Sequence, residues 1–109
     1  MSNESACPTV SAEDLAARVA ARDDIYVVDL REPRDFHAGH IPDALLLPAG
    51  QFADRYAREL DPGDAVILVC EKGMTSEAAV RFLRAQGFTN VASLAGGMAA
   101  YTGPLDSGD

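Results

Sequence analysis

The chain of 109 residues carries a formal net charge of −8, and 48% of its residues are apolar. This length fits one domain with a modest core, and the acidic balance argues against nucleic acid or an anionic membrane surface as a partner. The two cysteines, Cys7 and Cys70, are too few for a disulfide framework. The N-terminal region contains Glu13 and Asp14 and no continuous apolar stretch, which predicts a cytoplasmic protein without a membrane segment.

Apolar runs alternate with helical patterns between two polar ends, residues 1–7 and 103–109, which we interpret as flexible tails. Ser11 followed by Asp14 is typical of a capped helix start and predicts a helix over 12–21. In chain order, the other expected elements are strands at 9–10, 25–29, 44–47, 65–69 and 91–94, and helices at 51–60, at 76–84 and from Gly97 to about Tyr101.

The central apolar run, residues 65–69, shows no alternation of polar and apolar side chains. Such runs are typical of strands in parallel sheets that are covered on both faces. The order of the elements therefore predicts an α/β domain in which a parallel sheet is layered between helices.

Cys70 follows this run directly, and the expected helix begins six residues later at Ser76. In a strand–loop–helix arrangement the loop's backbone N–H groups can surround the sulfur, and the helix start adds partial positive charge. Both effects favour the thiolate, which is the reactive form of cysteine. The pattern indicates a nucleophilic Cys70, with a structural buried cysteine as the alternative.

Four further segments resemble the motifs of a rhodanese-type domain. They are Val27–Pro33, Gly39–Ala44, Gly87–Val91 and Leu94–Met98, which flank the Cys70 loop in the family's order. The resemblance implies a three-layer α/β/α domain over residues 8–103 with a central, mostly parallel five-stranded sheet. It also implies that Cys70 becomes a persulfide and passes the sulfur on, with no further cofactor.

The loop after Cys70 resembles the Cys-Arg-Lys-Gly-Val-Thr form of thiosulfate:cyanide sulfurtransferases, with Glu71 in place of the arginine. Glu71 next to the sulfur is expected to oppose Lys72 and to repel anionic donors. Gly73 allows a tight ring of amides around one atom. The predicted substrate-binding residues are Glu71, Lys72, Gly73, Met74, Thr75 and Ser76.

Outside the loop, Asp29 and Arg31 are interpreted as an ion pair that braces the site or contacts substrate, and Arg34 as a looser anion contact. His40 is expected to hydrogen-bond backbone at a turn. No metal site is predicted, because His37 and His40 lack further ligands. No arginine lies between Cys70 and Arg81 to clamp a phosphoryl group, which argues against a phosphatase.

The leading functional hypothesis is a monomeric sulfurtransferase. It moves sulfane sulfur from thiosulfate or another persulfide to a thiol or cyanide through a Cys70 persulfide. The alternative is a sulfur-carrier or protein-interaction module with little turnover, whose acceptor is a protein; the acidic surface and Glu71 motivate it. A third hypothesis is a redox sensor in which Cys7, otherwise an incidental thiol, pairs with Cys70.

Overall fold

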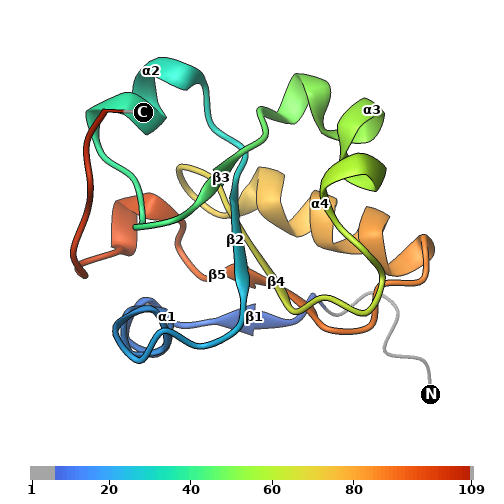
Figure 1. The fold of residues 1–109 in the computed structure, drawn as a ribbon, viewed down its shortest axis with the longest axis horizontal. Helices are drawn as coiled ribbons and strands as arrows, with labels where there is room; N and C mark the ends of the chain where they lie inside the picture. Colours follow the sequence, from blue (N-terminus) through green and yellow to red (C-terminus); the bar gives the residue numbers. More distant parts are fainter. Residues whose placement is uncertain (1–6, 109) are drawn as a thin grey trace.

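The computed structural model describes residues 7–108, which fold around one five-stranded sheet. The strands are β1 (Thr9–Val10), β2 (Tyr26–Asp29), β3 (Leu45–Leu46), β4 (Val66–Val69) and β5 (Val91–Leu94). Their order in the sheet is β1-β5-β4-β2-β3, and every pairing is parallel (Figure 1). The α/β fold with a central five-stranded parallel sheet is therefore confirmed.

Helices cover both faces of the sheet, as expected for strands that are apolar on both sides. They are α1 (Ala12–Ala20), α2 (Pro33–Ala38), α3 (Ala49–Glu59), α4 (Met74–Ala85) and the single 3₁₀ turn η1 (Met98–Ala100). Two separate apolar cores result. One joins Val28 and Leu68 to Phe52 of α3 and Leu83 of α4, and the other joins neighbouring strand residues such as Ile67 to α1 and Tyr101. The domain therefore has three layers.

Three helices differ from the sequence-based prediction by more than one residue. The helix expected over 51–60 begins two residues earlier, at Ala49. The helix expected to begin at Ser76 begins at Met74, because Gly73 takes up a left-handed conformation and serves as its N-cap. The six-residue helix α2 was not predicted. It begins with Pro33 at its first position, where a missing N–H costs nothing, but it is too short to show a helical period.

The C-terminal segment runs beside α2 (Figure 1). His40 and Asp106 exchange two backbone hydrogen bonds of 2.9 and 2.8 Å, and Gly108 N–H donates to the carbonyl oxygen of His37 at 2.8 Å. The predicted tail 103–109 therefore contacts the domain at these points. Residues 1–6 of the predicted N-terminal tail lie outside the described residues. None of the helices in the described part of the chain is both long and apolar enough to cross a membrane.

Candidate active site

Cys70 lies one residue beyond β4, at the edge of the sheet where the parallel strands end. Its sulfur accepts hydrogen bonds from the backbone N–H groups of Gly73, at 3.1 Å, and Ser76, at 3.3 Å. Only 6% of the residue is exposed. The sulfur therefore sits at the bottom of the loop, enclosed by main-chain donors.

The first turn of α4 explains this geometry. The first N–H groups of a helix have no partner inside the helix, and an N-cap side chain normally accepts from one of them. The N-cap here is Gly73, which has no side chain and whose φ of 101° is in the left-handed region. The Cys70 sulfur takes the acceptor's place, and it lies where the helix end adds partial positive charge.

Four further N–H groups of the loop remain unused. In the described part of the chain, those of Glu71, Lys72, Met74 and Thr75 donate to no protein acceptor. Their side chains are all exposed, whereas Gly73 and Ser76 are buried. The loop therefore keeps its main-chain donors free around the sulfur while its side chains face solvent.

A second segment supports the loop from the other side. Met98 N–H donates to the carbonyl oxygen of Cys70 at 2.8 Å, and Ala99 N–H to that of Glu71 at 2.9 Å. These bonds need a close approach at Gly97, where an added Cβ would lie 2.5 Å from the Glu71 carbonyl oxygen. Sequence reasoning gave Gly97 only the role of starting a short helix, because this contact depends on tertiary packing.

A buried pair of hydroxyl groups lies behind the sulfur. Ser76 Oγ is 3.4 Å from Cys70 Sγ and 2.6 Å from Ser93 Oγ, and both serines are almost fully buried. Ser93 was missed from the sequence. The one signal for it was a polar residue inside the expected strand 91–94, since a buried hydroxyl needs a partner.

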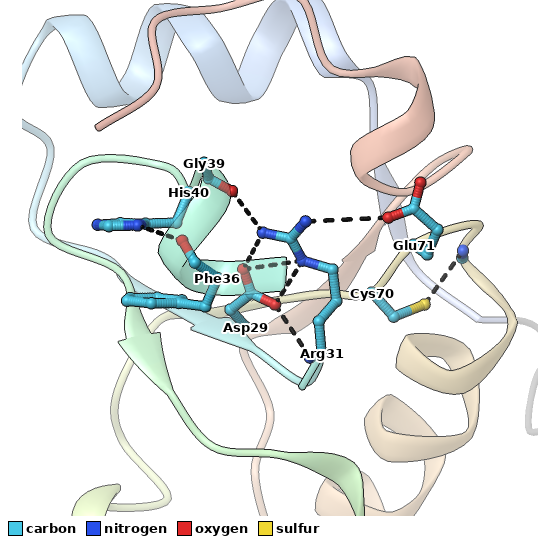
Figure 2. Close-up of polar contacts among 8 residues, drawn as sticks. Asp29, Arg31, Phe36, Gly39, His40, Cys70 and Glu71 are labelled. Carbon is cyan, nitrogen blue, oxygen red and sulfur yellow. Dashed lines mark hydrogen bonds and ion pairs between the residues drawn. The ribbon is translucent and has the colours of Figure 1, made fainter. Parts of the chain in front are cut away.

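Asp29 and Arg31 form the predicted ion pair (Figure 2). The carboxylate of Asp29 is fully buried, and it accepts from Arg31 Nη2 at 2.8 Å, from Nε at 3.0 Å and from the Arg31 backbone N–H. Arg31 Nη2 also donates to the carbonyl oxygen of Gly39 at 2.7 Å. The side-chain hydrogen bonding to Asp29 raises the pKa of Arg31, so its charge is fixed.

Glu71 connects this ion pair to the Cys70 loop. One carboxylate oxygen of Glu71 lies 3.8 Å from Arg31 Nη1, with 60% of the side chain exposed (Figure 2). Its negative charge therefore faces both the guanidinium and solvent. Because an exposed pair is weak, Glu71 remains available to interact with molecules that approach the loop.

The remaining predicted residues lie elsewhere. Arg34 is exposed on α2 and lines a hollow beside Leu45 and Leu46 of β3, with no contact to Cys70. His40 is buried, its Nδ1 lies 2.7 Å from the carbonyl oxygen of Phe36, and its ring stacks on the Phe36 ring. Its expected backbone hydrogen bond is therefore confirmed. Residues 7–108 contain no group of three side chains suited to a metal ion.

Cys7 lies against α4 rather than in solvent. Its sulfur is 3.9 Å from the carbonyl oxygen of Glu77, and it packs against the core cluster that contains Cys70. Burial and the nearby Glu77 carboxylate raise the pKa of the Cys7 thiol. The smaller thiolate fraction argues against Cys7 as a resolving thiol in a redox sensor.

Comparison with known proteins gives one family. Residues 11–103 match the model of the rhodanese-like domain. The chain is 35% identical over 80 residues to the thiosulfate sulfurtransferase GlpE of Pseudoalteromonas translucida (strain TAC 125), covering 73% of this chain and 75% of that protein. It is 33% identical over 104 residues to the "Putative sulfur carrier protein YrkF" of Bacillus subtilis (strain 168), covering 95% of this chain but only 56% of that protein.

Solved structures show the same fold. The rhodanese-like domain of the Anabaena sp. Alr3790 protein superposes with a TM-score of 0.83 at 27% identity, covering 92% of this chain and 79% of that one. A thiosulfate sulfurtransferase from Pseudomonas aeruginosa gives a TM-score of 0.84 at 26% identity, covering 97% of this chain and 21% of that one.

Proposed function

This chain belongs to the rhodanese-like domain family, and we propose that it is a sulfurtransferase that carries sulfane sulfur as a persulfide on Cys70. The donor is thiosulfate or another persulfide, and the acceptor is a thiol or cyanide. The observation that carries the proposal is the placement of the Cys70 sulfur at the start of α4, where it accepts from two backbone N–H groups. Related proteins are named sulfurtransferases, which supports the reaction class.

In the first step, the Cys70 thiolate attacks the outer sulfur of thiosulfate. A bond forms between the two sulfur atoms, the sulfur–sulfur bond of thiosulfate breaks, and sulfite leaves with the bonding electron pair. Cys70 then carries a persulfide anion, and no oxidant or reductant is consumed. In the second step, cyanide or a thiolate attacks the terminal sulfur, takes it away and restores the Cys70 thiolate.

The loop supplies what this cycle needs. In the persulfide the negative charge lies on the terminal sulfur beyond Sγ, and the free N–H groups of Glu71, Lys72, Met74 and Thr75 can donate to it. In this proposal Lys72 attracts the anionic donor, and Ser76 Oγ, 3.4 Å from the sulfur, donates a hydrogen bond to the thiolate. Asp29 and Arg31 act as positioning residues, because the guanidinium donates to Asp29 and to the carbonyl oxygen of Gly39.

Intact mass after incubation with thiosulfate tests the first step directly. The wild-type protein is expected to gain one sulfur atom, and Cys70→Ala to gain none. Cys7→Ser is the matched control, since it removes the other thiol and should gain sulfur like the wild type. Equal transfer from thiosulfate to cyanide by the wild type and Cys70→Ala would end the proposal.

A sulfur-carrier module with little turnover of free thiosulfate is the second candidate. Glu71 favours it, because an exposed carboxylate at the loop repels a dianion. The variant Glu71→Arg separates the two functions. A steep rise in thiosulfate turnover would mean that the native loop disfavours this donor, which supports the sulfur carrier. No change would mean that Glu71 does not repel the donor, which supports the sulfurtransferase.

A further inference from the structure

We propose that the exposed rim of the Cys70 loop is a contact surface for a protein segment that carries a cysteine flanked by basic and apolar residues. The rim consists of the side chains of Glu71, Lys72, Met74 and Thr75. The proposal rests on the sulfur transfer described above and names the class of thiol that exchanges sulfur with Cys70.

Because the Cys70 sulfur is buried, a thiol that reacts with it must come close to the rim. Cys70 is 6% exposed, and a persulfide extends it by one sulfur–sulfur bond, about 2 Å. An acceptor thiol must therefore come close to the loop to reach the terminal sulfur. The residues that flank the acceptor's cysteine would then lie against the exposed side chains on either side of the opening.

Met74 supplies an apolar contact. It is 80% exposed, whereas the other large apolar side chains exposed in residues 7–108, Tyr26 and Leu105, are 46% and 51% exposed. Met74 is also the first residue of α4, two residues before a donor to the sulfur. Flexible, unbranched methionine suits surfaces that bind varied partners.

The charges around the loop favour a basic partner. The positive charge of Arg31 is already matched by buried Asp29, yet the carboxylates of Glu71 and Asp35 are also close enough to raise its pKa. Both of these side chains are exposed, so three carboxylates surround the one guanidinium of Arg31 and negative charge is in excess there. Lys72 offsets part of it, but the chain as a whole carries −8.

The acceptor preference of the loaded protein tests this surface. Two synthetic pentapeptides serve as probes, each with a central cysteine between two leucines and with lysine at both ends or glutamate at both ends. At low ionic strength the lysine peptide is expected to remove the sulfur from Cys70 about two- to five-fold faster, the size of an exposed ion-pair effect. The preference should shrink at high salt.

Variants one residue apart give opposite expectations. Glu71→Gln should lower the lysine-to-glutamate rate ratio, and Lys72→Gln should raise it. Met74→Ala should slow discharge by both peptides more than it slows discharge by cyanide, because cyanide makes no apolar contact. Glu59→Gln is the control. Glu59 is the last residue of α3, which precedes the start of β4, whereas Cys70 follows the end of β4. This variant removes the same charge and should leave the ratio unchanged.

A binding measurement makes the result independent of sulfur loading. Versions of both peptides with serine in place of cysteine are titrated into the unmodified protein, and NMR shifts of the Met74 methyl group and the Glu71 amide are followed. Larger shifts with the lysine peptide support the surface even if Cys70 never gains sulfur, an outcome that would defeat only the sulfur-transfer proposal. Equal shifts and a rate ratio of one would overturn the surface and leave sulfur transfer intact.

Discussion

Two polar clusters at the carboxyl edge of the sheet differ in how fully they use their hydrogen-bonding groups. At the end of β2, the buried carboxylate of Asp29 is occupied by the backbone and side chain of Arg31, which also holds the carbonyl oxygen of Gly39. At the end of β4, two N–H groups hold the Cys70 sulfur and four others in the described loop have no protein acceptor.

The difference separates a group that stabilises the fold from one that is available to a ligand. Buried polar groups in folded proteins are nearly always paired, so a saturated cluster such as Asp29–Arg31 fixes its neighbours. A cluster with unused donors around one sulfur is prepared for an anion that arrives later. Glu71 contacts Arg31 from the Cys70 loop and links the two clusters.

Removing one charge from the saturated cluster should have the largest effect on stability. Asp29→Asn leaves the Arg31 side chain, only 10% exposed, without its buried carboxylate partner and facing only exposed carboxylates such as Glu71. The free energy of unfolding should fall by about 3 kcal/mol. Cys70→Ala removes a single small side chain at the rim of the core, without leaving a buried charge unpaired, and should cost about 1 kcal/mol. Urea denaturation of both variants measures the difference. Equal losses of unfolding free energy in the two variants would contradict the view that the Asp29–Arg31 cluster stabilises the fold more than the Cys70 cluster does.

Two glycines with left-handed backbone, one before β5 (Gly87) and one after it (Gly97), provide a sharper contrast. Gly97→Ala places a Cβ 2.5 Å from the Glu71 carbonyl oxygen, so the backbone must move, which should cost about 2 kcal/mol and slow sulfur loading of Cys70 at least ten-fold. Gly87→Ala is the matched control. Its φ of 97° is also left-handed, but nothing lies within 4 Å of the added Cβ. It should cost about 1 kcal/mol and leave loading unchanged.

Intact mass at timed intervals after addition of thiosulfate measures loading in both glycine variants, with urea denaturation in parallel. Normal loading in Gly97→Ala would mean that the support from the η1 segment does not shape the loop. Slow loading in Gly87→Ala would instead point to a general loss of stability as the cause.

The features of the fold and site that could be predicted from the sequence are those determined by residues close together in the chain. The strand 91–94 and the helix after Ser11 follow from apolar runs and caps, and the structure has them within a residue of the expected bounds. The ion pair of Asp29 and Arg31 was expected because both follow the same buried strand. In these places, neighbouring residues determine the conformation.

The errors arose where one specific contact, rather than an apolar pattern or a capping side chain, decides the structure. The first turn of α4 looked like loop because Gly73 lacks a capping side chain, and its cap is the sulfur of Cys70 three residues earlier. Ser93 contributes through a contact with Ser76, seventeen positions away in the chain. Gly97 matters through its closeness to the Glu71 backbone. None of these contacts leaves a periodic pattern in the sequence.

The buried hydroxyl pair offers the smallest and most selective test. Ser76 Oγ has one proton and three neighbours, which are Cys70 Sγ at 3.4 Å, the carbonyl oxygen of Gly73 at 3.1 Å and Ser93 Oγ at 2.6 Å. When Ser93 donates to Ser76, the Ser76 proton is left for Sγ or for the Gly73 carbonyl oxygen.

Ser93→Ala removes that donor but leaves the Ser76 proton in place, so stability should fall by about 1 kcal/mol and sulfur loading should slow about two-fold. Ser76→Ala removes the only side-chain hydroxyl in the described chain that contacts the sulfur, and loading should slow further even though its N–H still donates to Sγ. Timed intact-mass measurements compare the two. If Ser93→Ala slows loading as much as Ser76→Ala does, the two hydroxyls act as one unit, and the Cys70 cluster depends on side-chain donors as well as on its main chain.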